Sequence, residues 1–263
     1  MITPAWRTGL EHAIARAYAL GYDAVVEGFA PYEALREEVA GYVRRSAPPG
    51  ATVLDVACGI GNVCLHLGRL GYQVRGFDAV GTLIDVARAK QRASGLTNVW
   101  FDELDIARTA PPGAGELDST GGLGPRSTGR AVPAPSLRAS PVDVLVSMNT
   151  LYWHPDPQAL LRGCRAAVKR DGHAVFVTYG RRARVVRTCR EVRAAQGSAA
   201  ALRALRWLVP TAAFELVRDF EPRYLDQREL HAMLSGAGFD VLEDRTTFLA
   251  GLCRLVWTRV QGG

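Results

Sequence analysis

The sequence predicts an α/β fold with a largely parallel sheet, because short apolar runs alternate along the chain with segments of helical periodicity. The first such run also stops at a pair of glycines directly before a helical segment, as a strand–turn–helix unit does. The expected strands are 52–56, 73–77, 98–101, 142–147, 174–178, 239–250 and 253–260. The expected helices are 4–29, 32–45, 63–70, 83–94, 157–168 and 226–237.

The opening part of the chain is predicted to be helical. In the second helix, Leu35, Val39 and Val43 recur at helical spacing, and the Ala-Pro-Pro-Gly sequence at 47–50 ends the pattern. The apolar run at 52–56 then has the length and composition of a buried strand. Strands and helices alternate from there, so each pair of strands is joined by a crossover helix.

The later elements carry their own boundary signals. Asp156 is a favourable helix N-cap and Pro157 suits the first helical turn, so a helix should begin there. After the helix at 226–237, two strand-like runs end the chain. No internal repeat is found.

Composition places the chain among ordinary globular proteins. Its 263 residues allow one large domain or two small ones, with 48% hydrophobic and 22% charged residues. No apolar run approaches the roughly 20 residues that a membrane span requires, and no signal peptide is recognisable. Five cysteines without a C-x-x-C pair suit a reducing compartment and no metal site. We therefore expect a cytoplasmic protein without a membrane partner.

The chain is expected to comprise a helical cap at residues 1–46 and a main domain at 47–263. Within the main domain, segment 109–140 is rich in Gly, Pro, Ser and Thr and lacks periodicity. We interpret it as a flexible insertion, with a substrate lid as the alternative. Segment 181–224 is expected to be a second, helical cap insertion.

The net charge of +6 is concentrated in one segment. Eight arginines lie between Arg181 and Arg206 against one acid, Glu191, so the remaining chain carries a charge of about −1. A solvated cap face is one interpretation, and a funnel for an anionic acceptor is another. Nucleic-acid binding is disfavoured because the segment lacks interleaved stacking aromatics.

The glycine-rich turn after the first strand is the strongest local signal. Gly59 and Gly61 allow close approach of the backbone to a ligand, and a helix begins near Asn62. A dinucleotide fingerprint would require a third glycine at position 64, which is Cys64, and the Asp55 carboxylate would repel a pyrophosphate. A ligand that carries an ammonium and a sulfonium would instead be attracted.

A second carboxylate closes the next strand. Asp78 lies seventeen residues after Gly61, at the carboxyl end of that strand, where an acid can accept both hydroxyls of a ribose. The alternative is a helix N-cap for the segment that starts near Thr82.

The pattern Asp55-x-x-x-Gly59-x-Gly61, together with Asp78, resembles motif I and the following acid of the class I S-adenosylmethionine-dependent methyltransferases. The pair Asp105-Ile106 and the segments 147–157 and 168–176 resemble later parts of that family. The resemblance covers residues 50–108 and 141–180. It implies a doubly wound, mostly parallel, seven-stranded Rossmann-like sheet with an antiparallel last strand and a helical cap.

The resemblance also implies the cofactor S-adenosyl-L-methionine and the residues that bind it. Asp78 would bind the ribose, Ala79 would flank the adenine, and Asp105 would accept the exocyclic amine while Ile106 packs on the ring. Asp102 and Glu103 are nearby rivals for the role of Asp105. The full expected set is Asp55, Ala57, Cys58, Gly59, Gly61, Asn62, Asp78, Ala79, Asp105, Ile106 and Asn149.

Tyr152 and His154 are the candidate catalytic residues. In the family, many relatives carry His or Glu where this chain has Tyr152, and His154 lies two residues further on. We favour catalysis by proximity, with both side chains positioning the acceptor, because a phenol is a poor proton acceptor at neutral pH. The alternative assigns His154 as the general base.

The acceptor is expected to be a small molecule, aromatic or anionic. The N/D-P-P-Y/F sequence of amino-methylating enzymes is absent after the fourth strand, where Ser147-Met148-Asn149-Thr150 stands. Cytosine C5 methyltransferases need a nucleophilic cysteine in a Pro-Cys or Thr-Cys context at a sheet loop, whereas Thr188-Cys189 lies in a helical pattern. Further aromatics that could line an apolar pocket are Phe220 and Tyr224. The predicted acceptor-binding residues are Tyr22, Phe29, Tyr32, Trp153, Tyr179 and Arg182.

We therefore predict a monomeric or homodimeric methyltransferase of specialised metabolism, with O-methylation favoured over N- and C-methylation. RNA or protein methylation is a further alternative. An NAD-type oxidoreductase is disfavoured by Asp55 and Cys64, and an inactive partner subunit by the intact Asp55, Gly59, Gly61 and Asp78.

Overall fold

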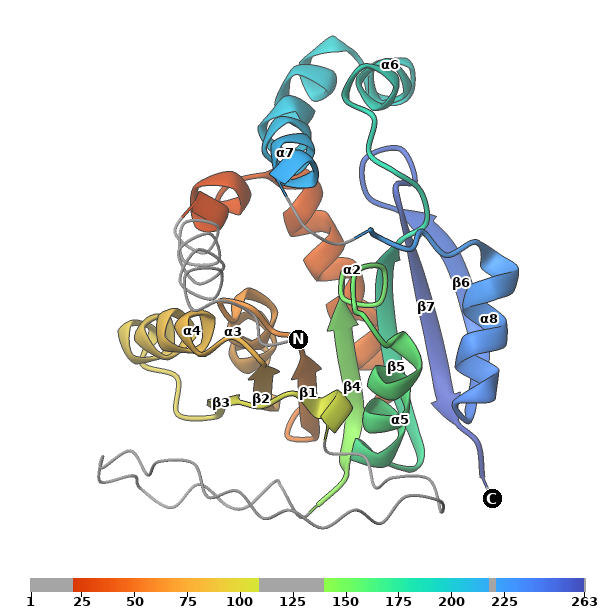
Figure 1. The fold of residues 1–263 in the computed structure, drawn as a ribbon. Coiled ribbons are helices and arrows are strands. Elements are labelled where there is room, and N and C mark those ends of the chain that lie inside the picture. The colour runs from red at the N-terminus through yellow and green to blue at the C-terminus, as the bar shows by residue number, and fades with distance from the viewer. Residues whose placement is uncertain (1–20, 109–139, 218–220, 263) are drawn as a thin grey trace, which may run out of the picture.

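The computed structural model describes residues 21–108, 140–217 and 221–262, the side chains of 214–217 excepted. Its centre is a seven-stranded sheet of order β3-β2-β1-β4-β5-β7-β6 (Figure 1). The strands are β1 (Thr52–Val56), β2 (Gln73–Asp78), β3 (Val99–Glu103), β4 (Val142–Met148), β5 (Val168–Tyr179), β6 (Phe239–Thr247) and β7 (Cys253–Val260).

Strands β1 to β5 pair in parallel, whereas β7 lies antiparallel between β5 and β6. The predicted doubly wound, mostly parallel sheet with an antiparallel last strand is therefore confirmed. The order of the strands reverses between β1 and β4, and ligands of open α/β sheets bind at the carboxyl ends of the strands beside such a reversal.

Helices cover both faces of the sheet (Figure 1). One core cluster joins Val53 and Val144 of the sheet to α2, α3 and α4, and the other joins Leu54 and Leu145 to α5 and α8. This follows from alternation, because successive side chains of a strand point to opposite faces. The helices are α2 (Ala30–Ser46), α3 (Asn62–Arg69), α4 (Gly81–Ser94), η1 (Ile106–Arg108), α5 (Pro157–Ala167), α6 (Val185–Gln196), α7 (Ser198–Val217) and α8 (Gln227–Gly236).

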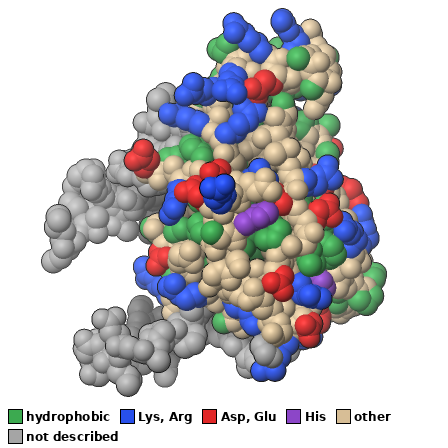
Figure 2. Space-filling view, turned by 90° about the vertical axis from the view of Figure 1, so that its right-hand side faces the viewer, with side chains coloured by type: hydrophobic (Ala, Val, Ile, Leu, Met, Phe, Trp, Pro, Cys, Tyr) green, Lys and Arg blue, Asp and Glu red, His purple; other side chains and the backbone are tan. Residues whose placement is uncertain are grey.

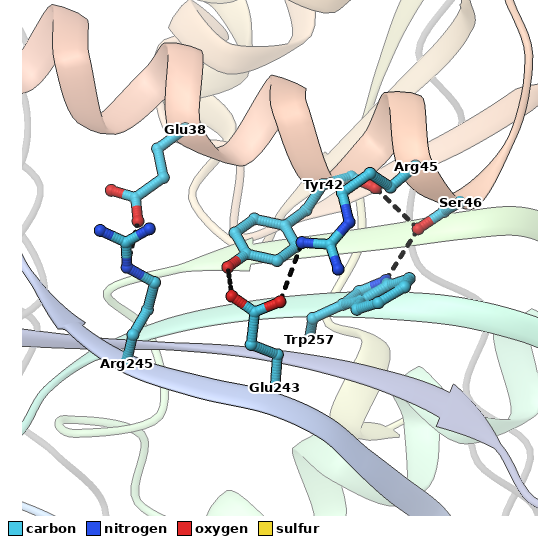
Figure 3. A network of polar contacts seen from close by, with 7 residues as sticks. All are labelled: Glu38, Tyr42, Arg45, Ser46, Glu243, Arg245 and Trp257. Atoms are coloured by element: carbon cyan, nitrogen blue, oxygen red, sulfur yellow. Dashed lines mark hydrogen bonds and ion pairs between the residues drawn. The ribbon is translucent and has the colours of Figure 1, made fainter.

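Helix α2 is fastened to the far edge of the sheet by polar contacts (Figure 3). The Tyr42 hydroxyl donates to Glu243 on β6, whose other carboxylate oxygen accepts from Arg45 at 2.9 Å. At the end of α2, the Ser46 hydroxyl accepts from the Trp257 indole at 2.9 Å. Helix α2 is thus attached to β6 and β7, which lie at the opposite end of the sheet from β2 and β3.

Two strand boundaries differ from the sequence prediction by three residues or more. Strand β5 begins at Val168, not at 174, because Val168 already pairs with Val142. The register then shifts before Val144 pairs with His173, and Asp171 within this irregular stretch has a left-handed φ of 58°. Strand β6 ends at Thr247, not at 250, because four successive residues, 248–251, have positive φ. This left-handed turn is closed by the Leu252 N–H, which donates to the Phe248 carbonyl at 2.9 Å.

Helices α6 and α7 form a hairpin that rises above the sheet in Figure 1. In α6, Thr188 and Val192 are the buried residues. Figure 2 shows Lys and Arg side chains gathered on the upper part of the molecule, where this hairpin lies. Among the described residues, no helix is both long and apolar enough to cross a membrane.

Three sequence predictions fall on parts of the chain outside the described residues. These are the first helix up to residue 20, the insertion from 109 to 139, and Phe220. The end of the first helix is described, since residues 21–26 are helical.

Candidate active site

The turn after β1 has the conformation that its glycines permit. Ala57, Gly59 and Gly61 have φ of 58°, 54° and 79°, in the left-handed region that favours glycine. A Cβ on Gly61 would lie 2.5 Å from the Phe101 ring, so this position tolerates no side chain. A Cβ on Gly59 would meet nothing within 4 Å, which leaves open space beside the loop.

Asp78 holds this loop from the neighbouring strand. Its two carboxylate oxygens each accept one backbone N–H, from Gly59 and from Val80, both at 2.9 Å. Burial raises the pKa of Asp78, and the two N–H donors oppose that rise. Helix α4 begins at Gly81 and has no side-chain cap, so the N-cap interpretation of Asp78 is wrong. Each oxygen retains a lone pair with which it can accept a ligand hydroxyl.

Asp55 lies beneath the loop, with 2% of its surface exposed. The Cys64 thiol donates to its carboxylate at 3.2 Å. Burial, with a smaller contribution from the charge of Asp78, raises the pKa of Asp55 to about 7. Cys64 packs under Gly76 together with Cys58, and a Cβ on Gly76 would lie within 2.8 Å of both sulfur atoms. Position 64 is therefore a packing position and a donor to Asp55.

Asp105 lies at the carboxyl end of β3, one residue before η1. Its carboxylate accepts the Ala107 N–H at 3.0 Å and pairs with Arg108 at 3.1 Å. The neighbouring Leu104 N–H donates to the Asp78 carbonyl at 2.9 Å, so the two acidic segments lie side by side. Ile106 is buried.

The two rivals of Asp105 have different surroundings. Asp102 forms an ion pair with Arg75 at 2.7 Å. The Glu103 carboxylate lies so close to Gly81 that a Cβ there would collide with it.

The polar groups and the open space around the loop fit S-adenosylmethionine. A buried carboxylate suits the ribose hydroxyls, and the open space at Gly59 admits a ligand against the backbone. Helix α3 starts at Asn62 without a side-chain cap, so its first N–H groups are available to an anionic group such as a carboxylate. Among the described residues, no group of three or more His, Cys, Asp or Glu could hold a metal ion.

The turn after β4 carries the candidate catalytic residues. Asn149 has a φ of 56°, and its N–H donates to the Val177 carbonyl at 2.7 Å. Trp153, 39% exposed, donates its indole N–H to the Asn149 carbonyl at 2.5 Å. The turn is thus anchored to β5 and braced by its own tryptophan, and Asp156 caps α5 by accepting the Ala159 N–H at 2.8 Å.

His154 is oriented by the backbone. Its Nδ1 accepts the Asp156 N–H at 3.1 Å. A neutral imidazole whose Nδ1 accepts carries its proton on Nε2, so the other ring nitrogen is a donor in this arrangement. Such a nitrogen can donate a hydrogen bond to an oxygen of a bound molecule, whereas it cannot remove a proton without first changing tautomer.

Most of the aromatic residues predicted for the acceptor gather around Trp207 of α7. Its ring stacks on Phe29 and Tyr32, with centroid distances of 6.1 and 6.0 Å, and meets Tyr22 edge-on at 5.8 Å. The Trp207 indole donates to the Tyr179 hydroxyl at 2.8 Å inside the core. Trp207 is not among the residues predicted from the sequence, although it lies beside a buried helical face formed by Ala201, Ala204 and Leu208.

Tyr152 lies next to this group. Its ring centroid is 4.9 Å from that of Tyr179 and 6.2 Å from that of Tyr224. The Tyr152 carbonyl accepts the Arg223 N–H at 2.6 Å. We define the aromatic cluster as Tyr22, Phe29, Tyr32, Tyr152, Tyr179, Trp207, Tyr224 and Phe248, which meets Trp207 at 5.1 Å.

The arginines of the hairpin have varied roles. Arg181 and Arg187 both pair with Glu191, at 2.6 and 2.9 Å, and Arg181 also donates to the Ala250 carbonyl. Arg182 is exposed at the base of the hairpin. Exposed arginines of α6 and α7 are Arg187, Arg190, Arg193, Arg203 and Arg206.

Similarity to known proteins extends over most of the chain. The family model described as a methyltransferase domain matches residues 29–244. A ubiquinone biosynthesis O-methyltransferase of Pectobacterium atrosepticum is 27% identical over 82% of this chain and 78% of its own length. An enzyme of the same name from Acinetobacter baylyi is 25% identical over 50% of this chain, which spans about half (45%) of that relative.

Solved structures share the fold. The magnesium protoporphyrin IX methyltransferase of Synechocystis PCC 6803, crystallised with bound S-adenosylmethionine, superposes with a TM-score of 0.58 at 14% identity. That match covers 95% of this chain and 97% of the other.

Proposed function

Because the chain belongs to the methyltransferase-domain family and is an S-adenosylmethionine-dependent methyltransferase, we propose that it methylates an oxygen atom of a small aromatic acceptor. The observation that carries the proposal is the contact of Tyr152, in the turn after β4, with Tyr179 and Tyr224. Aromatic side chains favour offset or edge-on packing with other rings, so this turn suits a planar acceptor. The relatives named as O-methyltransferases support oxygen as the methylated atom.

The cofactor residues of the proposal are those around the glycine loop. Asp78 would accept the ribose hydroxyls, Ala79 and Ile106 would flank the adenine, and Asp105 would accept its amine. Asp55 would affect cofactor binding indirectly, through the glycine loop, because it is buried beneath that loop. When bound, S-adenosylmethionine supplies a methyl group already activated by its positively charged sulfur.

The protein's own contribution to catalysis is alignment. Holding an acceptor oxygen in line with a methyl group gains much of the rate of such a displacement without covalent chemistry by the protein. His154 would keep its Nε2 proton and donate a hydrogen bond through it to an oxygen of the methyl acceptor, because Nδ1 already accepts the Asp156 N–H. Tyr152 would hold the acceptor ring, and the acceptor's own proton would leave to solvent.

We also propose that the aromatic acceptor carries an anionic group. Arg182 is exposed at the base of the arginine-rich hairpin, where it could attract a carboxylate on the same aromatic molecule. We further propose specialised metabolism as the source of the acceptor and the cytoplasm as the site of action. The cysteines, all five of them free, support a reducing compartment.

A panel of matched acceptors tests the proposal. Benzene rings that carry a hydroxyl, an amine or a carboxylate would be incubated with methyl-labelled S-adenosylmethionine, and initial rates of label transfer compared. We expect transfer to hydroxyl compounds at least tenfold faster than to the matched amines. Faster transfer to the amines would contradict oxygen as the acceptor atom. No transfer to any ring, with transfer to an aliphatic alcohol, would contradict the aromatic acceptor.

A further inference from the structure

The described end of the first helix, residues 21–26, is bound to the cofactor side of the molecule through one side chain. The two carboxylate oxygens of Asp23 accept from the Lys90 ammonium at 2.8 and 3.0 Å. Lys90 also donates to the side-chain oxygen Oδ1 of Asn62 at 2.5 Å. The side-chain Nδ2 of Asn62 in turn donates to the Asp23 carboxylate at 3.4 Å. We call Asp23, Asn62 and Lys90 the latch.

The latch lies directly beside the glycine loop. Asn62 is the first residue of α3 and follows Gly61, whose positive φ completes the turn. Lys90 comes from α4, the helix that follows Asp78. The latch therefore joins α3 and α4, which flank the expected cofactor site, to a helix that comes from the N-terminal part of the chain.

The two residues next to Asp23 contact the aromatic cluster and helix α7. Tyr22 packs edge-on against Trp207 and Tyr32 in the aromatic cluster. The Ala24 carbonyl accepts from the Arg206 guanidinium of α7, with 3.0 Å to Nε. This carbonyl belongs to the last turn of the helix, where it has no partner within the helix, so the arginine also acts as a cap. In Figure 1 the red segment that begins at residue 21 lies beside α7.

We propose that Lys90 is a positioning residue that keeps helix 21–26 in place over the cofactor loop and so links cofactor retention to the acceptor-side cluster. Asp23 and Asn62 are its partners. The side chain of Lys90 is only 26% exposed, although Asp23 is 41% exposed. An isolated surface ion pair contributes little, but Lys90 bridges two partners from two different segments. The proposal needs cofactor binding and does not depend on which atom of the acceptor is methylated.

The chain offers a matched control for a test. It contains only two lysines, and Lys169 likewise pairs with an aspartate, Asp143, at 2.6 Å. Asp143 is near the start of β4 and Lys169 near the start of β5, at the ends of the strands opposite to the site. Lys90→Met and Lys169→Met thus remove the same chemistry at the two ends of the sheet.

The experiment measures release of labelled S-adenosylmethionine, chased with excess unlabelled S-adenosylhomocysteine, from the full chain. We expect Lys90→Met to release it about three- to tenfold faster, the range for a partly exposed ion pair with an added hydrogen bond. Lys169→Met should release it at the wild-type rate, and Lys90→Arg should stay within about twofold of wild type. No acceptor is present, so failure of the O-methylation proposal leaves this outcome unaffected.

Amide hydrogen exchange at residues 21–29 provides the second measurement. Bound S-adenosylmethionine should slow exchange there in wild type and in Lys169→Met, but much less in Lys90→Met. Equal release rates for Lys90→Met and Lys169→Met would overturn the proposal. So would a lower melting temperature of Lys90→Met with unchanged release, because Lys90 would then be structural only.

Discussion

Asp78 links the glycine loop to the second strand through two backbone hydrogen bonds, and this makes it the residue on which cofactor binding should depend most. The residue is 7% exposed, and its carboxylate retains lone pairs on both oxygens. A buried acceptor with unused capacity is costly unless a partner satisfies it. The ribose hydroxyls of the cofactor would be that partner.

Replacing Asp78 with Asn should weaken S-adenosylmethionine binding by about ten- to a hundredfold, because hydrogen bonds to a charged group contribute about 1.5–3 kcal/mol. Titration calorimetry measures this. Asp143→Asn is the control, since Asp143 also accepts a backbone N–H, that of Thr52 at 2.9 Å, far from the site. Equal affinities of Asp78→Asn and wild type would exclude Asp78 from the ribose site.

Asp55 should make the stability of the cofactor-free protein depend on pH. Its pKa in the folded chain is about 7, raised mainly by burial, and lies near 3.9 in the unfolded chain. Between these values the folded state binds the additional proton, so the free energy of unfolding falls as pH rises from about 4 to 7. The Asp55 contribution is at most about 1.4 kcal/mol per pH unit.

Urea unfolding between pH 4.5 and 7.5 checks this dependence. Asp55→Asn removes the titrating group, so the variant should lose less stability than wild type across that interval. Parallel curves for the two proteins would show that Asp55 is not responsible.

His154 should act as a donor and not as a base. Its Nδ1 accepts the Asp156 N–H, and glutamine can replace an imidazole donor. We expect His154→Gln to lose less than about tenfold in single-turnover methyl transfer, with His154→Ala losing more, and the pH profile to keep its shape. A loss above roughly a hundredfold in both variants, with disappearance of a pH transition, would identify His154 as the base.

At the scale of elements, α7 is joined to the sheet by one buried hydrogen bond. Trp207 donates to the Tyr179 hydroxyl at the carboxyl end of β5, and the left-handed turn between β6 and β7 brings Phe248 against the same indole. Left-handed φ at three non-glycine residues costs about 1–2 kcal/mol each, so the surrounding packing must hold this turn.

Tyr179→Phe should therefore destabilise the chain by about 1–3 kcal/mol, because it leaves the Trp207 donor buried and unpaired. In Tyr179→Phe/Trp207→Phe both partners are apolar, and the double variant should lose less than the sum of the two single variants. Urea unfolding of the four proteins gives the coupling. Additive losses would mean that the bond contributes nothing specific.

At the scale of the whole molecule, local signals and long-range contacts differ in what the sequence reveals. Strand β1, the turn at Gly59 and Gly61, and the cap at Asp156 depend on neighbouring residues and were predictable. The end of β6 was not, because Phe248 and the two residues after it have no turn signature.

The latch and the position of Trp207 were also beyond sequence reasoning. Asp23 and Lys90 are 67 residues apart, and no pattern along the chain pairs them. Trp207 lies on a helix that is rich in alanine and leucine along its whole length, so its place at the centre of the aromatic cluster emerges only when α7 packs on β5. Local turns and caps were therefore predicted better than the contacts that join distant segments.

The most direct test of the central claim is the position of the transferred methyl group. The enzyme would be given S-adenosylmethionine carrying ¹³C in its methyl group and an aromatic acceptor that bears both a hydroxyl and an amine on one ring. Nuclear magnetic resonance of the product then locates the label. We predict a methyl ether on the hydroxyl oxygen, whereas label on the nitrogen or on a ring carbon would contradict the account.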